Sequence, residues 1–206
     1  MGLSVWLAFV ATAIGILVIP GPTISLVMSY ALSQGSRAAA AIVAGVALGD
    51  LTAMSLSLVG LGALLATSAT LFTALKWIGA TYLVYLGIKL WRAPLEAADT
   101  TATTVPAKVM FGHAWLVTAL NPKSIVFFVA FVPQFIDPHR PYLPQALILI
   151  ATFVVLAAAN AGAYALVASR LKSAIRRPSV QRWVNRTGGT VLVGAGVAAV
   201  AWKRTG

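Results

Sequence analysis

Residues 3–32 read LSVWLAFVATAIGILVIPGPTISLVMSYAL, and this stretch indicates the class of fold. It is apolar over residues 3–19, is interrupted by Pro20-Gly21-Pro22, and is apolar again over residues 23–32. A helix needs about 20 apolar residues to cross the hydrocarbon core of a bilayer. The whole stretch is too long for one straight span, and proline breaks a helix. We therefore expect a membrane span that is broken near the two prolines.

The composition of the chain points to the same solvent. Of its 206 residues, 60% are hydrophobic and only 9% are charged, and the mean hydropathy is +0.91. A soluble domain carries about 25% charged residues, so lipid must be the solvent for most of this chain. The net charge of +11 resides in bases that cluster between apolar runs, where they set topology and meet anionic lipid head groups. We therefore expect a lipid bilayer, and no nucleic acid, as partner.

Five more apolar runs follow the first, at residues 38–66, 72–90, 111–136, 146–169 and about 184–202. Each is long enough to span a bilayer, so the sequence predicts an all-α, polytopic transmembrane bundle of about six spans. Residues 1–206 are then one transmembrane transporter domain, with a Thr/Ala/Pro-rich linker at 92–108. Residues 170–186 carry six bases among scattered apolar side chains, a pattern typical of a segment that lies on the membrane surface.

The distribution of Lys and Arg predicts the orientation in the membrane. The loops after the first, third and fifth runs carry most of these bases. Because cytoplasmic loops are enriched in Lys and Arg, we expect loops 1, 3 and 5 in the cytoplasm and both termini outside. A five-span topology would move one terminus to the other side.

The first and fourth runs contain similar breaks. Residues 19–27 include Pro20-Gly21-Pro22-Thr23, and residues 120–126 include Asn121-Pro122-Lys123, one hundred residues later. Each break falls in the first span of a three-span half, about 1–95 or 109–206. Because halves with an odd number of spans run in opposite senses, the sequence predicts two inverted three-helix repeats. Discontinuous helices at matching places in two halves indicate a transporter site.

One lone polar side chain stands in the second span of each half, Asp50 in the first and Asn160 in the second. Asp at the centre of a membrane helix costs about 2.5 to 3.5 kcal/mol, so Asp50 should face a cavity or a partner. The functional interpretation is a group that couples protons or binds a substrate ammonium. The alternative is a structural hydrogen bond between helices, or an ion pair with Lys123.

The tripeptide Asn121-Pro122-Lys123 is a helix start inside a membrane span. Asn is a strong N-cap, and Pro fits the first helical position because it needs no partner for an N–H. The helix end and Lys123 are both positive, so they would attract an amino-acid carboxylate. A proline kink whose lysine reaches the interface is an equal alternative. At the matching break, Gly21 permits close approach of a ligand, although a hinge without substrate contact is an equally good interpretation.

The remaining motifs predict packing and exclude other classes of protein. Gly45 and Gly49 form a small-xxx-small motif, which favours close helix packing. His113 and His139 form no cluster with metal-ligand spacing, and there is no cysteine, so we expect no metal site. No glycine-rich phosphate loop ends in Gly-Lys-Ser/Thr, and no intramembrane nucleophile has a base beside it. We therefore expect no enzyme activity and no cofactor.

These motifs occur in the order seen in a known family. The chain resembles the LysE/RhtB amino-acid exporter family over nearly its whole length, at Pro20-Gly21-Pro22, Gly35-x-Arg37, Gly45-x-x-x-Gly49-Asp50, residues 76–87 and Asn121-Pro122-Lys123. The resemblance implies export of amino acids or close derivatives from the prokaryotic cytoplasm, driven by the proton-motive force. It also implies residence in the cytoplasmic membrane and suggests a homodimer.

Three functions remain to be compared. The first is secondary-active export of amino acids, in which Asp50 and the two breaks frame a site near the bilayer midplane. The second is export of another small metabolite or a cation; metal efflux should need more than one intramembrane carboxylate or histidine. The third is a membrane scaffold without transport, which the polar breaks at matching places disfavour.

Overall fold

The computed structural model describes the chain except residues 36–38, 68, 93–104, 171–177 and 202–206. All regular elements in these described parts are helical, which confirms the all-α prediction. They are α1 (Leu3–Val18), α2 (Pro22–Gln34), α3 (Ala39–Thr67), α4 (Ala69–Trp91), α5 (Ala107–Ala119), α6 (Pro122–Ala130), the 3-10 helix η2 (Val132–Phe135), α7 (Tyr142–Arg170) and α9 (Pro178–Ala201).

Both expected breaks are present. Helices α1 and α2 are bent by 56° relative to each other, and α5 and the segment that follows it by 43°. Pro22 and Pro122 are the first residues of the second helix in each pair, because proline lacks the N–H that would continue the preceding helix. The sequence therefore located both interruptions correctly.

Two helices are long and apolar enough to cross a membrane, namely Ala39–Gly60 within α3 and Tyr142–Arg170. Each bent pair counts as one more if it forms a single broken span, so the described residues contain two to four candidate spans. Helices α4 and α9 coincide with the predicted runs 72–90 and 184–202. The count of six spans and the inverted repeats stay predictions.

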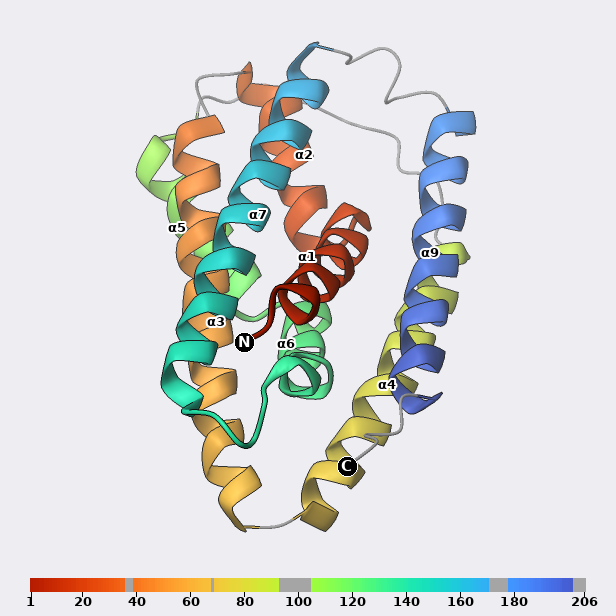
Figure 1. Ribbon diagram of the computed structural model, residues 1–206. Helices are drawn as coiled ribbons and strands as arrows, with labels where there is room; N and C mark the ends of the chain where they lie inside the picture. Colours follow the sequence, from red (N-terminus) through yellow and green to blue (C-terminus); the bar gives the residue numbers. More distant parts are fainter. Residues whose placement is uncertain (36–38, 68, 93–104, 171–177, 202–206) are drawn as a thin grey trace.

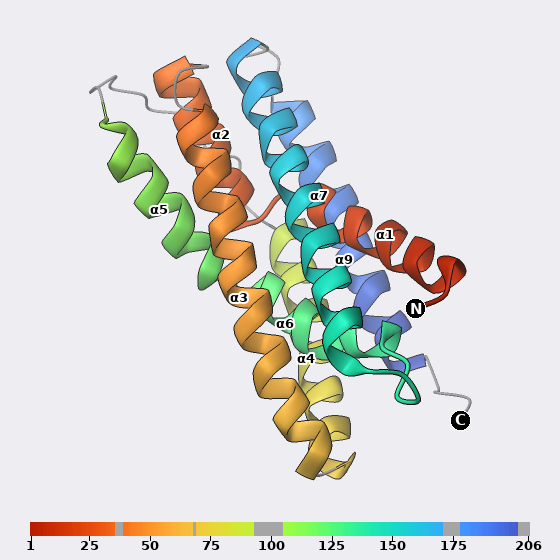
Figure 2. The same ribbon diagram turned by 60° about the vertical axis from the view of Figure 1, so that its left-hand side comes forward.

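The helices form two groups with the half-helices α1 and α6 between them. In Figure 1, α2, α3, α5 and α7 stand together on one side, and the pair α4 and α9 stands on the other. Helix α3 packs against α5 and α7, and α4 packs against α9. Figure 2 shows α1 inclined steeply to α3 and α7, as the bend at its end requires.

Two apolar clusters stabilise this arrangement. One joins α2, α3, α5 and α7 through small and branched side chains, including Val27, Val46 and Ala161. The other surrounds the half-helices and includes Phe9 of α1, Phe128 of α6 and Leu83 of α4. The half-helices are thus held by both groups, which places their broken ends in the interior.

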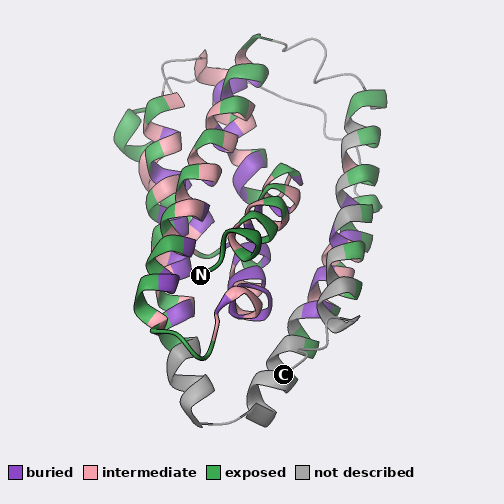
Figure 3. Cartoon of the chain, in the orientation of Figure 1, coloured by how far each residue is buried: buried purple, intermediate pink, exposed green. Residues whose placement is uncertain are grey.

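Many large apolar side chains are exposed and the interior holds polar groups, as expected for a protein in lipid. Leu56 and Val59 are 69% and 73% exposed, whereas Asp50 and Lys123 are only 3% and 8% exposed. Figure 3 shows exposed residues along the outer faces of the long helices. Burying charged groups costs free energy unless they are compensated, so their position needs a structural or functional reason.

Glycines bring neighbouring helices close together. A Cβ atom on Gly45 would lie 2.5 Å from the carbonyl oxygen of Phe111, and one on Gly49 would lie 2.8 Å from that of Trp115. Both glycines of the small-xxx-small motif therefore face α5. Gly87 of α4 and Gly189 of α9 approach each other in the same way, a contact that the sequence analysis did not predict.

Described residues of the predicted surface-lying segment 170–186 belong to two long helices, and its position on a membrane surface stays a prediction. Arg170 is the last residue of α7, and residues 178–186 form the first turns of the long helix α9. Pro178 suits the first position of a helix, so α9 begins there and includes basic residues before the apolar run predicted at about 184–202. Residues 171–177, and residues 93–104 of the predicted linker 92–108, lie outside the described residues.

Candidate functional site

The two helix breaks meet in the interior. The Asn121 side-chain amide donates a hydrogen bond to the hydroxyl oxygen of Thr23, at 3.0 Å, across 98 residues of sequence. The hydroxyl of Thr118, near the end of α5, donates to the same oxygen at 3.3 Å. All three side chains are buried, so the start of α2 and the junction of α5 and α6 form one polar contact.

The start of α6 has the predicted capping geometry. The Asn121 side-chain oxygen accepts a hydrogen bond from the Lys123 backbone N–H at 3.1 Å, and Pro122 is the first residue of the helix. Asn121 thereby satisfies one of the N–H groups that have no partner at a helix start. Its amide remains available for the contact with Thr23.

The other side of the first break is a row of backbone carbonyls at the end of α1. The Lys123 ammonium donates to the carbonyl oxygens of Ile16 and Ile19, at 3.1 and 2.7 Å. Two polar side chains of α7 complete the row: Asn160 donates to Leu17 at 3.0 Å and Tyr164 donates to Val18 at 2.6 Å. Because the last carbonyls of a helix lack partners within it, these donors compensate the broken end.

Asp50 of α3 faces the same region without such partners. Its side chain is buried, yet the described part of the chain offers its carboxylate no hydrogen bond and no ion pair. The structural alternative of an Asp50–Lys123 ion pair is therefore absent from this arrangement of the described residues, although the two opposite charges attract each other. The ammonium binds the end of α1 instead.

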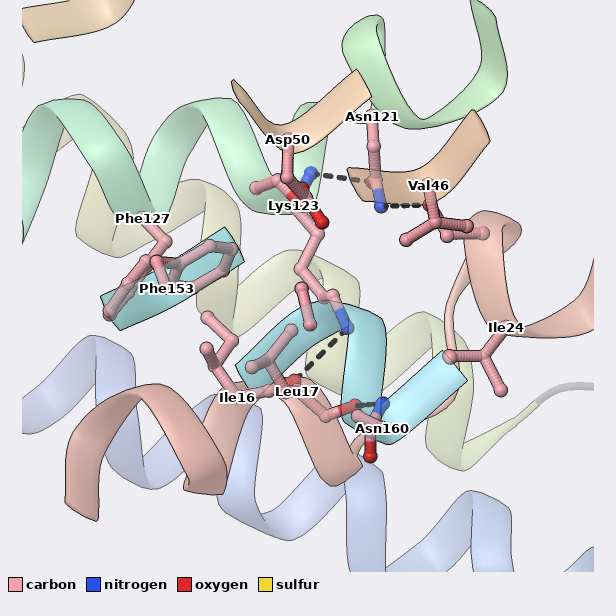
Figure 4. Close-up of a pocket in the computed structure, with 13 residues that line it drawn as sticks. Ile16, Leu17, Ile24, Val46, Asp50, Asn121, Lys123, Phe127, Phe153 and Asn160 are labelled. Carbon is pink, nitrogen blue, oxygen red and sulfur yellow. Dashed lines mark hydrogen bonds between the residues drawn. The ribbon is translucent and has the colours of Figure 1, made fainter. Parts of the chain in front are cut away.

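These groups line one small cavity. Figure 4 shows Asp50, Asn121, Lys123 and Asn160 around it, and Thr23 lines it as well. Five of the predicted site residues, from two halves of the chain, are thus brought together. The apolar walls come from the four helices α1, α2, α3 and α7 and from Phe127 of α6.

The cavity has a volume of about 20 Å³. A cavity of about 10 to 15 Å³ holds one water molecule, and ligand pockets have about 300 to 1,000 Å³. The space therefore suits a water molecule and not an amino acid. In this conformation the protein is closed around its polar centre, and a larger ligand requires a side chain or a helix to move.

The other predicted residues shape the site without lining it. Pro20, Pro22 and Pro122 interrupt the helices. Gly21 lies beside Lys123, since a Cβ atom there would be 3.4 Å from its ammonium nitrogen. Gly45 and Gly49 face α5 and not the cavity.

The sequence analysis missed several contributors. Tyr164, whose type suggests an interfacial or packing role, caps α1 together with Asn160 four residues earlier on the same helix face. Ser124 and Phe127 line the cavity from α6, and Phe153 lines it from α7. The spacing of four between Asn160 and Tyr164 was the available signal, since it places both on one face of α7.

The histidines serve other contacts. His113 accepts or donates a hydrogen bond with the Tyr30 hydroxyl at 2.7 Å, between α5 and α2. Among the residues that the structure describes, no group of three His, Cys, Asp or Glu side chains lies close enough to hold a metal ion.

Comparison with known families identifies the class of the chain. The family model of the LysE type translocator matches residues 14–201, which include both breaks, Asp50 and every residue of the cavity. No solved structure matches the chain.

Curated relatives match over most or nearly all of the length. The chain is 40% identical to a protein of Vibrio cholerae serotype O1 named "Uncharacterized membrane protein", over 98% of this chain and 100% of that one. It is 39% identical to the "Homoserine/homoserine lactone efflux protein" of Salmonella typhi, over 94% and 96%. It is 34% identical to the "Leucine efflux protein" of Salmonella choleraesuis, over 73% and 71%.

Proposed function

This chain belongs to the family of LysE type translocators, and on that premise we propose that it exports amino acids or close derivatives from the cytoplasm. It is a membrane transporter and not an enzyme. The observation that carries the proposal is the cavity between two helix breaks, where the buried Asp50 carboxylate and the end of α1 face each other. Intramembrane ionisable groups that face a cavity mark substrate or ion pathways.

The names of the relatives indicate the chemistry of the substrate. Homoserine, homoserine lactone and leucine share an α-ammonium group next to a neutral side chain. The lactone has no free carboxylate, so the ammonium is the charged group that all three have in common. In the described part of the cavity wall Asp50 is the only acidic side chain, and Ile24, Val46 and Phe153 are apolar. Because the α-ammonium of the substrate occupies this one carboxylate, no acidic side chain of the described wall is left for a basic side chain. The lining therefore favours neutral amino acids over those with basic side chains.

Asp50 has a role in energy coupling under this proposal. Export against a gradient needs an energy source, and the chain has no nucleotide-binding loop. A single buried carboxylate that alternately binds a proton and the substrate ammonium would couple export to the proton-motive force. The N-terminal ends of α2 and α6 are positive and would face a carboxylate of the substrate, as would Lys123 once its ammonium leaves α1.

The architecture proposed for transport has six spans in two inverted halves, 1–95 and 109–206, in the cytoplasmic membrane. The helix contacts support it, because α3 packs on α7 and α4 packs on α9, as equivalent helices of two related halves would. Loops 1, 3 and 5 would be cytoplasmic. The homodimer rests on the family resemblance alone.

A flux assay tests the proposal. Proteoliposomes that contain the purified protein and are loaded with radiolabelled leucine, homoserine or homoserine lactone should release the label faster when a proton gradient is imposed. Asp50→Asn keeps the size of the side chain and removes its charge, so it should lower gradient-driven release by about tenfold or more. Asp137→Asn, which removes an exposed carboxylate paired with Arg140, is the matched control and should transport normally.

Two results would contradict the proposal. Release that is equal in empty and protein-containing vesicles for every amino acid tested would favour the scaffold. Normal gradient-driven release by Asp50→Asn would remove Asp50 from energy coupling.

Tolerance of cells to toxic amino-acid analogues on overexpression would identify the substrate.

A further inference from the structure

The end of α1 already binds an ammonium group, and this group belongs to the protein. The Lys123 ammonium lies 2.7 Å from the carbonyl oxygen of Ile19 and 3.1 Å from that of Ile16. Two of its three N–H donors are used in this way. Lys123 is 8% exposed, and its side chain crosses from α6 to reach these oxygens, close to Gly21.

The carbonyl row attracts cations in general. The C-terminal end of a helix carries a partial negative charge of about half an elementary charge. In transporters with broken helices, such ends and the unwound carbonyls beside them bind small cations. The ammonium of an amino acid has the same charge and the same three donors as that of lysine, so it can make the same two hydrogen bonds.

A second observation marks the same place as a site. The Asp50 carboxylate lies on the wall of the cavity that Lys123 and Ile16 also line. It is 3% exposed, and the described residues provide it with no hydrogen bond. A buried carboxylate without donors is unfavourable unless a proton, a water molecule or a cation joins it in some state of the protein. The cavity of about 20 Å³ is too small to admit the ammonium of an amino acid together with the carbon atoms that carry it while Lys123 occupies the carbonyls.

We infer that the carbonyls at the end of α1, together with Asp50, form the ammonium-binding subsite for the transported molecule, and that Lys123 occupies this subsite in the substrate-free protein. The inference rests on the proposed function. Substrate ammonium displaces Lys123, takes its hydrogen bonds with Ile16 and Ile19, and replaces it as the cation whose charge attracts Asp50. The displaced lysine side chain frees space in the cavity, and its ammonium becomes available to a substrate carboxylate.

The alternative is that Lys123 is a permanent cap of α1. The two roles predict opposite changes in affinity. A tethered competitor lowers the apparent affinity for an amine, so its removal tightens binding. A permanent cap organises the site, so its removal weakens amine binding or leaves it unchanged.

Leucinamide is a suitable probe because it carries the ammonium of leucine without a free carboxylate. Its binding is measured by scintillation proximity on protein in lipid nanodiscs. Lys123→Met should bind it about tenfold more tightly than the wild type, because no competitor must be displaced. Lys123→Gln should show a smaller gain of severalfold, because its neutral amide competes less well than an ammonium. Lys123→Arg keeps a cation and should bind as the wild type does, and so should Lys89→Met, which removes an exposed cation of α4. For leucine the gain should be smaller, since the partner of its carboxylate is lost.

The glutamine variant keeps an amide donor for one carbonyl, and it is the variant to use if Lys123→Met fails to fold. A measurement on the wild type needs no variant. Acetylation of Lys123 relative to that of the exposed Lys89 in the same sample, measured by mass spectrometry, should rise several-fold when leucinamide is saturating, because the displaced ammonium becomes reactive. The ratio corrects for reagent that the amine of leucinamide consumes.

Equal or weaker leucinamide binding by the folded Lys123 variants, or unchanged acetylation of Lys123, would overturn the inference in favour of a permanent cap. Tighter binding of sodium without tighter binding of leucinamide would assign the subsite to a metal cation and overturn it as well. Each of these results can occur in a protein that exports leucine, whereas failure of the proposed function is the loss of export by the wild type.

Discussion

The two helix breaks have similar sequences, but the hydrogen-bond partners of their helix ends come from different places. At the second break, Asn121 caps α6 with its own side chain, and the Leu120 backbone N–H bonds to Leu116 within α5. At the first break, Gly21 offers α2 no side-chain cap, and the carbonyls that end α1 are bonded by side chains from α6 and α7. Side chains of the second half therefore complete the hydrogen bonding of the first break, although the two breaks look alike in sequence.

This asymmetry separates hydrogen-bond donors from acceptors by half of the chain. The donors Lys123, Asn160 and Tyr164 come from the second half, and the acceptors come from the end of α1 in the first. The unpaired carboxylate of Asp50 also comes from the first half. The second half therefore supplies the donors at this place, and the first half supplies the acceptors and the acidic side chain.

Among substitutions at the two breaks, Lys123→Ala should cause the largest loss in the free energy of unfolding. The change leaves the carbonyls of Ile16 and Ile19 without donors in the interior and should lower the free energy of unfolding by about 2 to 6 kcal/mol. Chemical unfolding in detergent micelles measures it, and Lys89→Ala, an exposed lysine of α4, is the control. A loss no larger than that of the control would mean that the first break does not depend on the second half.

Asn121→Ala should have a smaller effect, because it removes the cap of α6 and the bond to Thr23 at once. We expect a loss of about 1 to 3 kcal/mol in the free energy of unfolding. Asn121→Ser keeps a neutral oxygen that can accept from the Lys123 N–H and loses the amide donor, so it separates the two contributions. If the serine variant were as unstable as the alanine variant, the contact between the breaks, and not the cap, would dominate.

Asn160→Ala should have the smallest effect of the three. It removes one hydrogen bond, to the Leu17 carbonyl, from a half-buried side chain, and should cost about 1 kcal/mol. Thermal unfolding of the variant, of Tyr164→Phe and of the double variant measures whether the two donors of α7 act independently. Additive losses would assign each donor to its own carbonyl, and a double loss equal to a single one would mean that they support α1 as a unit.

The composition and the apolar runs were enough to predict a helical membrane protein, because lipid leaves a chain few ways to satisfy its backbone. The break positions were also predictable, since Pro22 and Pro122 cannot continue a helix whatever surrounds them. Gly45 and Gly49 face a neighbouring helix as their spacing suggests, but the motif does not name α5 as the partner.

Lys123 illustrates what the sequence could not predict. Its position beside a helix start suggested that its ammonium would face a substrate carboxylate, yet in this structure it reaches back to the end of α1. The flexible stem of lysine can point to either side, and which side it takes depends on acceptors more than one hundred residues earlier. The role of Tyr164 was not predicted for the same reason, because its hydrogen-bond partner Val18 lies 146 residues away in the sequence.

The amino-acid sequence by itself determined the solvent of this protein, its helices, the places where two of them break, and the residue types available at those breaks. These properties follow from local chemistry: side-chain hydropathy, the missing N–H of proline and the capping ability of asparagine. Only the tertiary structure decided that the two breaks meet, that Asp50 is left without a donor, and that Lys123 binds α1. Hydrogen bonds across one hundred residues depend on how helices pack, and packing is a property of the whole chain.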